Sequence, residues 1–532
     1  MKKLTIIVLT LIVSLAAFLR FYKLDQVPPS LNWDEIAAGY NAYTIANWGA
    51  DEYGNKFPIV FKSFGDDKHP VHIYLTAVVV KIFGLSDYST RASSAFMGVL
   101  GVVAIYFLAK KLLKSEIAGL FSALFLAVSP YHLQFSRGLW EANFALDFFL
   151  AGLAAFYFGL DKKNWLLTLS FVFFGLSFFS YHSALVVVPP MVFLICLTNI
   201  KKLILSKKFF VAGLLVTIVF GALVIKEPKI LGFARIKQTQ FSREDVQATS
   251  IYKKTGIPLF GTAQMALGNY RKYFTYSYLF KTGDIGPRQS VKIIGEFYKI
   301  DLLLGALGLI ALLLTRNWQA FIIIFSWLAL SPIPGALSSS DPSANRGIFM
   351  IGPVILLSAG GASWILKIIK RKYLQVVAGV LIVVFLAYET GNYLRYYYIS
   401  YSKNDAIEWQ YGMKQIVDYL KRNPDYVKVY MDKIRQQPYI FFLYYFKIPL
   451  PDLLKTVKYD ESESKSYNTV LSFNKYQFGG WNIIDSYPSY KILYVITPSY
   501  YGGLKYLQQF NLNELIKYPN GSDAFYIVSG DQ

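Results

Sequence analysis

Long apolar runs recur along most of this chain and constrain its fold more than any other feature. A run of about 17 to 20 apolar residues is long enough to cross the hydrocarbon core of a bilayer as a helix. We expect eleven such spans, at residues 4–20, 92–109, 116–133, 144–160, 165–181, 184–199, 209–225, 299–315, 319–336, 348–366 and 374–390. The pattern therefore predicts an α-helical polytopic membrane protein.

Composition agrees with this fold class. Of 532 residues, 54% are hydrophobic and 16% are charged, whereas about a quarter are charged in soluble proteins. A net charge of +21 is compatible with nucleic-acid binding, but the Lys and Arg residues gather at the ends of apolar runs rather than along one soluble face. We therefore expect no nucleic-acid partner. The single cysteine, Cys196, lies inside an apolar run, which excludes disulfides and cysteine metal sites.

The distribution of basic residues orients the predicted spans. Lys2 and Lys3 and five later basic clusters fall on one side of the membrane when the eleven spans are drawn; the clusters are 110–114, 161–164, 201–208, 315–318 and 367–372. Because cytoplasmic loops are enriched in Lys and Arg, we expect a multi-pass plasma-membrane protein with a cytoplasmic N-terminus. The first apolar run shows no clear cleavage site and is interpreted as an uncleaved span. The shorter run 71–84 is interpreted as a half-buried juxtamembrane helix on the outer face.

The predicted topology places several long segments outside the membrane, among them 21–91, 226–298 and everything after about 391. The C-terminal part is rich in tyrosine and charge, with a helix-like stretch at 404–423 and strand-like stretches at 427–431 and 491–496. We therefore predict two domains: a transmembrane domain over 1–390 and a small extracytoplasmic α/β domain over 391–532.

The first outer loop carries two adjacent acids, Asp34 and Glu35, in the stretch "SLNWDEIAAGYNAY". Asn32 followed by Glu35 resembles a capping box, and acids at a helix N-terminus gain from the helix dipole. The same acids would equally be suited to catalysis at the membrane surface. From these residues alone, both interpretations stay open.

A second unusual stretch, "FGDDKHPVHIYL", contains Asp66, Asp67, Lys68 and His69 just before an aromatic apolar run. Lys68 could bind a phosphate at the lipid surface as a compact charge, or it could extend to the lipid headgroups. The acids and histidines, with His72, could also ligate a divalent metal, but their spacing matches no standard site. We therefore predict a phosphate and substrate site without a metal or other cofactor.

Three more polar stretches lie at predicted outer membrane entries. They contain Arg137 and Glu141, Asp284 and Arg288, and Arg346. Arginines at such positions can bind a phosphate head group with two parallel hydrogen bonds, or can simply anchor the chain at the interface. We predict Arg137 and Arg346 as phosphate ligands, and we predict Glu141, Asp284 and Arg288 as substrate-binding residues beside Asp66, Asp67 and His69.

The order of these motifs resembles a known family. A first span, a loop with "WDE", a loop motif with Lys and Pro, and then "RASSAFMGVLGVVAIYFLAKKLL" and "SPYHLQFSRGLWEANFAL" resemble the GT-C superfamily of membrane glycosyltransferases. The similarity is to the dolichyl-phosphate-mannose–protein mannosyltransferase and aminoarabinose transferase-like branch. It covers residues 1–200 well, and residues 270–366 resemble the later part of bacterial members.

The resemblance implies a reaction. A polyprenyl-phosphate sugar would be the donor, and a glycan, lipid or protein hydroxyl at the outer face would attack it with inversion. Asp34 matches the family's general base, with Glu35 orienting the site. Lys68 matches the lysine that stabilises the leaving phosphate, although His69 stands before Pro70 where the family often has proline directly. Membrane lipids are the expected surroundings.

Two other functions are compatible with a polytopic chain. A lipid-linked glycan transporter should carry charged residues inside its spans and inverted repeats, and we identify neither. A membrane-anchored cell-envelope assembly protein would act through its C-terminal domain, and it would leave Asp34, Glu35 and Lys68 unexplained.

Overall fold

The computed structural model of the chain describes residues 2–64, 66–161, 164–432, 437–460, 469–479, 490–504 and 506–530. The side chains of Lys2 and Asp66 and the basic residues Lys162 and Lys163 lie outside this described part. A helix occupies each of the eleven predicted spans. In chain order these helices are α1 (Lys2–Phe21), α4 (Asp87–Leu112), α5 (Glu116–Val128) with α6 (Pro130–Ser136), α7 (Glu141–Gly159), α8 (Trp165–Phe178), α9 (His182–Thr198), α11 (Lys207–Lys226), α16 (Lys299–Leu314), α17 (Trp318–Leu330), α19 (Ile351–Ile368) and α20 (Lys372–Tyr396).

The predicted class, a multi-pass helical membrane protein, is confirmed. Within the described residues, seven helical segments are long and apolar enough to cross a membrane, and the bent pair α5–α6, which turns by 58°, makes an eighth. The other predicted spans are helical but shorter, with 14 residues in α8, 17 in α9 and 16 in α16. A helix rises 1.5 Å per residue, so these three are about 21 to 26 Å long.

The chain forms two compact units. The helical unit comprises Met1–Tyr22, Asp67–His72 and Ser94–Arg395, and the sheet unit comprises Lys23–Asp66, Ile73–Ser93 and Tyr396–Gln532. Most of the segment between the first two predicted spans, residues 23–66 and 73–93, thus belongs to the same compact unit as the C-terminal part of the chain, whereas residues 67–72 belong to the helical unit. The assignment of 1–390 to the membrane and 391–532 to the outside stays a prediction.

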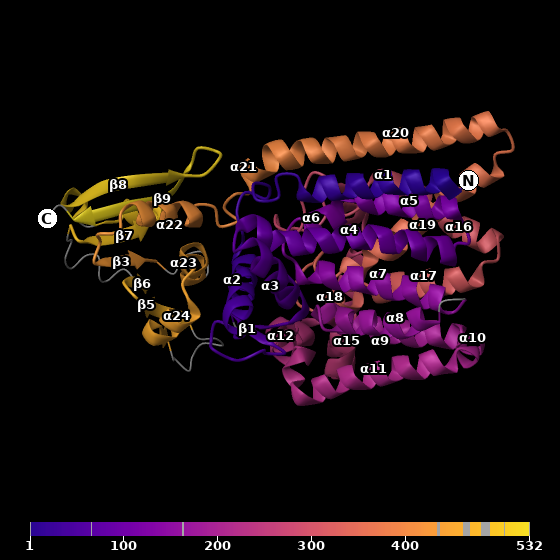
Figure 1. The fold of residues 1–532 in the computed structure, drawn as a ribbon, viewed down its shortest axis with the longest axis horizontal. Coiled ribbons are helices and arrows are strands. Elements are labelled where there is room, and N and C mark those ends of the chain that lie inside the picture. Colours follow the sequence, from indigo (N-terminus) through magenta and orange to yellow (C-terminus); the bar gives the residue numbers. More distant parts are fainter. Residues whose placement is uncertain are drawn as a thin grey trace. The chain divides into compact units, whose positions relative to one another are not determined.

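In the helical unit, long helices lie alongside one another (Figure 1). Small residues allow the backbones to approach closely. A Cβ on Gly308 of α16 would lie 1.9 Å from the carbonyl oxygen of Leu357, and one on Gly361 of α19 would lie 2.0 Å from that of Leu304. Such glycine contacts are a common way to pack helices where lipid removes the hydrophobic driving force. Short helices α12 (Phe233–Thr239), α13 (Arg243–Ala248), α14 (Ser250–Thr255) and α15 (Pro258–Lys272) form much of the long loop.

The sheet unit contains a seven-stranded mixed sheet of order β4-β5-β6-β3-β7-β9-β8 (Figure 1). The central strand β3 is parallel to both neighbours, and the other pairs are antiparallel. The bounds are β3 (Lys428–Met431), β4 (Lys458–Asp460), β5 (Thr469–Phe473), β6 (Tyr476–Phe478), β7 (Ile492–Ile496), β8 (Phe510–Lys517) and β9 (Asp523–Gly530). The strands predicted at 427–431 and 491–496 are therefore confirmed.

The helix predicted at 404–423 is shorter than expected. Only α22 (Met413–Arg422) is a continuous helix over this stretch, because Gly412 has a φ of 107° and the residues before it form turns. A left-handed residue of this kind interrupts an α-helix, and glycine adopts it at little cost.

Helix α2 (Trp33–Trp48), which carries the "WDE" acids, packs against α23 (Tyr439–Phe446) within the sheet unit. A Cβ on Gly39 would lie 2.8 Å from the Tyr444 ring, and the Tyr40 hydroxyl donates a hydrogen bond to the carbonyl of Ile448 at 2.9 Å. Helix α23 in turn places Phe442 against the rings of Tyr476 and Phe478 on β6. The short strands β1 (Phe61–Ser63) and β2 (Asp66–Lys68) and helix α3 (Val71–Phe83) follow in the chain, and α3 confirms the predicted helix at 71–84. The C-terminal part of the chain thus supports helix α2.

Candidate functional site

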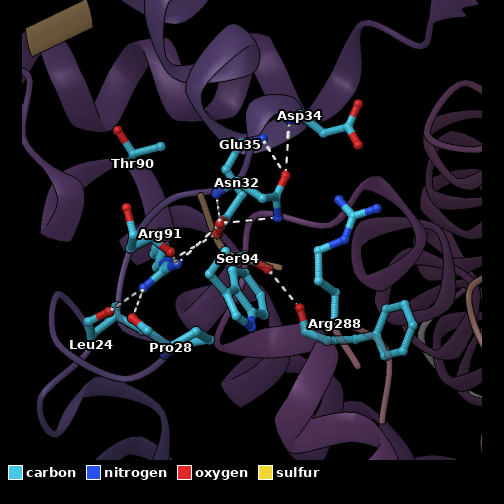
Figure 2. A network of polar contacts seen from close by, with 12 residues as sticks. Leu24, Pro28, Asn32, Asp34, Glu35, Thr90, Arg91, Ser94 and Arg288 are labelled. Carbon is cyan, nitrogen blue, oxygen red and sulfur yellow. Dashed lines mark hydrogen bonds and ion pairs between the residues drawn. The ribbon is translucent and has the colours of Figure 1, made fainter. Parts of the chain in front are cut away.

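A buried arginine organises the start of α2 (Figure 2). Arg91, near the start of α4, and Glu35 are both fully buried, and the guanidinium binds the carboxylate through two hydrogen bonds of 2.8 and 3.0 Å. The remaining donors reach the backbone carbonyls of Leu24, Pro28 and Ser30 at 3.1, 2.9 and 2.5 Å. One side chain therefore fixes both the loop before α2 and the first turn of α2.

The predicted capping box is present. The Asn32 side chain accepts hydrogen bonds from the backbone N–H groups of Asp34 (2.9 Å) and Glu35 (3.2 Å), and Glu35 accepts one from the Asn32 N–H (3.0 Å). Both Glu35 oxygens are thus occupied by protein donors, which suits an orienting role. Asp34 is half-buried, and its carboxylate points away from the Asn32–Glu35–Arg91 network (Figure 2).

Residues from the C-terminal part of the sheet unit hold the same region. The Gln410 side chain accepts a hydrogen bond from the Trp33 N–H at 3.2 Å, and the Trp409 ring centre lies 5.5 Å from the Arg91 guanidinium. Lys414 forms an ion pair with Asp87 at 2.9 Å. Since Trp33 and Asp34 are adjacent, these contacts restrict where the Asp34 carboxylate can be.

In the helical unit, Glu141 joins two residues of the second motif. Its two carboxylate oxygens lie 3.8 Å from Lys68 Nζ and 3.7 Å from His72 Nε2, and the three side chains are 12%, 15% and 3% exposed. We call Lys68, His72 and Glu141 the Glu141 cluster. Asp67 is half-buried next to it in the sequence. The predicted phosphate ligand Lys68 and the predicted substrate residue Glu141 are therefore brought together.

His69 is fully buried, and its ring centre lies 4.6 Å from that of His182. Burial, and then the neighbouring His182, hold the pKa of His69 well below its usual range. A neutral imidazole at this position can donate or accept a hydrogen bond without carrying charge.

The remaining predicted residues of the helical unit tie loops together. The Asp284 carboxylate accepts hydrogen bonds from the N–H groups of Gly286 (2.7 Å) and Ala344 (2.6 Å), and burial raises its pKa. Arg346 donates to the hydroxyls of Ser338 and Ser340. The Arg288 guanidinium lies 5.9 Å from the centre of the Trp140 ring, directly before Glu141 in the chain. Arg288 and Glu141 are thereby linked through one aromatic residue.

Arg137, predicted as a phosphate ligand, is bound to backbone. Its guanidinium donates to the carbonyls of Leu19, Arg20 and Tyr22 at 2.5, 3.2 and 2.9 Å, where α1 ends. Arg20 does the reverse, donating to Leu126 and Ala127 near the end of α5 at 3.2 and 3.0 Å. The last carbonyls of a helix lack partners inside it, so each arginine satisfies the end of a helix other than its own.

The expectation of spans without charged residues is wrong, since the predicted spans contain, among others, Arg20, Asp147, Lys299, Asp301 and Glu389. Asp147 falls inside the span predicted at 144–160, and the structure buries it in α7. His132 joins it to Arg20, with 3.1 Å from Nε2 to Asp147 and 2.7 Å from Nδ1 to Arg20. An acid within a span is costly unless paired, and here it balances a buried guanidinium. Among the described residues, no group of three or more His, Cys, Asp or Glu side chains is arranged to hold a metal ion.

The fold described above is similar to that of solved membrane-protein structures. ArnT from Cupriavidus metallidurans bound to undecaprenyl phosphate superposes with a TM-score of 0.57 at 13% identity, covering 98% of this chain and 99% of that one. Apo ArnT gives 0.54 at 12% identity, with the same coverage. The apo oligosaccharyltransferase of Archaeoglobus fulgidus gives 0.51 at 14% identity, covering 84% of this chain and 64% of that one.

Within this fold, residues 67–225 match the family profile described as Dolichyl-phosphate-mannose-protein mannosyltransferase. The matched segment contains the whole Glu141 cluster. No curated protein matches the sequence. The resemblance predicted from the sequence is thus confirmed as a similarity to this family profile and to the fold of these solved structures.

Sequence reasoning did not select Arg91, Arg20 or Gln410, and it considered His72 only as an alternative metal ligand. Arg91 had one usable signal, since an arginine directly before a predicted span needs a partner, and Glu35 is one of several acids in the preceding loop. The contact of Gln410 with Trp33 joins residues 377 positions apart, and nothing local indicates it.

Proposed function

We propose that this protein is an inverting glycosyltransferase that moves a sugar from a polyprenyl-phosphate donor to an acceptor hydroxyl at the outer face of the plasma membrane. The observation that carries the proposal is the pairing of Lys68 with Glu141 inside the segment that matches the mannosyltransferase family. A largely buried ammonium is a suitable ligand for a lipid phosphate, and a solved protein with this fold holds undecaprenyl phosphate. No cofactor is proposed.

In the proposed reaction, Asp34 accepts the proton of the acceptor hydroxyl as its oxygen attacks the anomeric carbon. The bond from that carbon to the phosphate oxygen breaks, and its electron pair leaves with the polyprenyl phosphate. Lys68, with Arg346, stabilises the charge that develops on the phosphate. Glu35 acts through Arg91 by fixing the first turn of α2, and so it orients Asp34 without touching the substrate.

The other predicted residues keep proposed roles around this chemistry. Asp66, Asp67, His69, Glu141, Asp284 and Arg288 are the proposed substrate-binding residues. Arg137, whose guanidinium is bound by the end of α1, is proposed to act on the phosphate only through the loop that it holds. The N-terminus is proposed to be cytoplasmic and residues 391–532 to be extracytoplasmic.

The test is sugar transfer by the purified protein in lipid nanodiscs, with a panel of labelled polyprenyl-phosphate hexoses and pentoses and membrane extracts as acceptors. Loss of a general base typically lowers kcat by about 100- to 10,000-fold, so Asp34→Asn should do so with little change in donor binding. Lys68→Met should lower kcat and should also weaken binding of the donor. Transfer by Asp34→Asn at the wild-type rate would remove Asp34 from the mechanism.

The same purified protein distinguishes a glycosyltransferase from a transporter or an assembly protein. For this test the purified protein is reconstituted into liposomes. Movement of a fluorescent polyprenyl-phosphate glycan across the liposome bilayer, with no transfer from any donor, would favour a flippase. Absence of both transfer and movement would favour the assembly role of the sheet unit.

A further inference from the structure

Glu141 contacts two side chains that can carry positive charge. Its oxygens lie 3.8 Å from the Lys68 ammonium and 3.7 Å from His72 Nε2, and neither distance is that of a short hydrogen bond. The lysine is therefore paired with a carboxylate but is not locked onto it. An ammonium in this state can move to another anion if one arrives.

We infer that Glu141 is a positioning residue that acts through Lys68, competing with the lipid phosphate for its ammonium and so promoting release of the product. This inference rests on the proposed function. The donor phosphodiester carries one negative charge, whereas the polyprenyl monophosphate left after transfer carries about −1.5 to −2 at neutral pH. Lys68 alone would thus hold the product more strongly than the donor, and a competing carboxylate opposes this without any covalent step or proton transfer.

The surroundings of Glu141 keep its carboxylate available for this competition. It is the first residue of α7, where the helix dipole favours an ionised acid. His72 holds the second oxygen, leaving the first directed at Lys68. The preceding residue, Trp140, is 5% exposed and packs against Arg288, which limits movement of this turn.

The experiment measures the affinity of a polyprenyl monophosphate for nanodisc-embedded wild type, Glu141→Gln, Lys68→Met and the double variant. Glu141→Gln should bind the probe about tenfold more tightly, which corresponds to about 1.4 kcal/mol. The double variant should bind like Lys68→Met. In steady-state transfer, Glu141→Gln should lower both KM for the donor and kcat, because a tighter product leaves more slowly.

A matched control exists on α5. Glu116→Gln breaks another Lys–Glu pair, Lys110–Glu116 at 3.0 Å, and should leave probe affinity and kinetics unchanged. Glu141→Asp, which restores the charge with a shorter reach, should return affinity toward the wild-type value. Equal melting temperatures of the variants would exclude misfolding as the cause of the changes.

The outcomes separate this inference from the proposed function. Probe binding that depends on Lys68 but is unchanged or weakened in Glu141→Gln would overturn the inference alone. If the double variant binds the probe more tightly than Lys68→Met does, Glu141 repels the phosphate directly. That result would also overturn the inference. Binding that is the same in wild type and Lys68→Met would remove the proposed phosphate ligand, and both proposals would fail.

Discussion

Glu52 makes the stability of the sheet unit depend on pH. It follows α2, is 2% exposed, and accepts hydrogen bonds from Asn41 (3.3 Å) and from the Tyr439 hydroxyl of α23 (3.2 Å). Burial, assisted by the charge of Asp51, raises its pKa from the usual 4.5 to about 8, although both hydrogen bonds act in the opposite direction. The folded protein therefore keeps this acid protonated at neutral pH.

The sign of the effect follows from which state holds the proton. Below pH 4.5 both states are protonated and Glu52 costs nothing. Between pH 4.5 and about 8 the unfolded chain ionises and the folded chain does not, so stability falls as pH rises and then levels off. At about 1.36 kcal/mol for each pKa unit, the loss reaches about 3 kcal/mol at pH 7 and levels off at about 5 kcal/mol above pH 8.

Glu52→Gln should remove this dependence while keeping both hydrogen bonds, since an amide can accept from Asn41 and donate to Tyr439. The assay is the melting temperature of the full-length protein in nanodiscs from pH 4.5 to 9. For a unit of this size, 1 kcal/mol corresponds to roughly 2–4 °C, so the variant should match wild type at pH 4.5 and melt roughly 6–12 °C higher at pH 7.

The variant Glu514→Gln, at a half-buried position on β8, serves as the control for replacing an acid by an amide elsewhere in the sheet unit. A constant offset between Glu52→Gln and wild type at every pH would refute the reasoning, because a structural effect of the amide would not titrate. So would a variant that is less stable than wild type at pH 8.

Three further predictions concern buried contacts. Arg91→Met leaves Glu35 buried without its partner and should cost about 3–5 kcal/mol, seen as a lower melting temperature and lost transfer, whereas the double variant Arg91→Met/Glu35→Gln should recover much of the stability. Gln410→Ala removes the acceptor of the Trp33 N–H and should lower kcat several-fold with an unchanged KM for the donor; an unchanged kcat would mean that this contact does not position Asp34. Asp147→Asn leaves Arg20 without its nearby acid and should reduce the yield of folded protein, while Arg20→Met/Asp147→Leu should restore it toward wild type; equal yields for all three would contradict the pairing.

The membrane part of the fold could be predicted because its physics is local. Each span is a continuous apolar segment, and its residues alone determine that a helix forms there. The spans at 4–20 and 209–225 match α1 and α11 within a few residues. The turn between α5 and α6 was not visible as a bend, because Ser129–Pro130 can either kink a continuous helix or divide it into two.

Residue roles were less predictable because they depend on partners distant in sequence. Asn32 and Glu35 are three residues apart, and their capping box was readable from spacing. Whether Glu35 faced solvent or a buried arginine depended on Arg91, 56 residues later. Arg137 shows the same limit, since an arginine at a membrane entry suits a phosphate or a helix end equally well, and only the fold shows the carbonyls of α1 beside it.

The C-terminal part of the chain gains a role from these contacts that its sequence did not suggest. No motif in residues 391–532 indicates chemistry. Yet Gln410 contacts the N-terminus of α2, Trp409 lies beside Arg91, and Tyr439 binds Glu52 in the turn after α2. A general base must be held within a fraction of an ångström of its productive position, and a loop of 71 residues between two spans cannot provide this by itself. Packing α2 against a sheet-backed helix supplies the missing rigidity. We therefore expect the proposed acid–base chemistry to be as sensitive to substitutions behind α2 as to those beside Asp34.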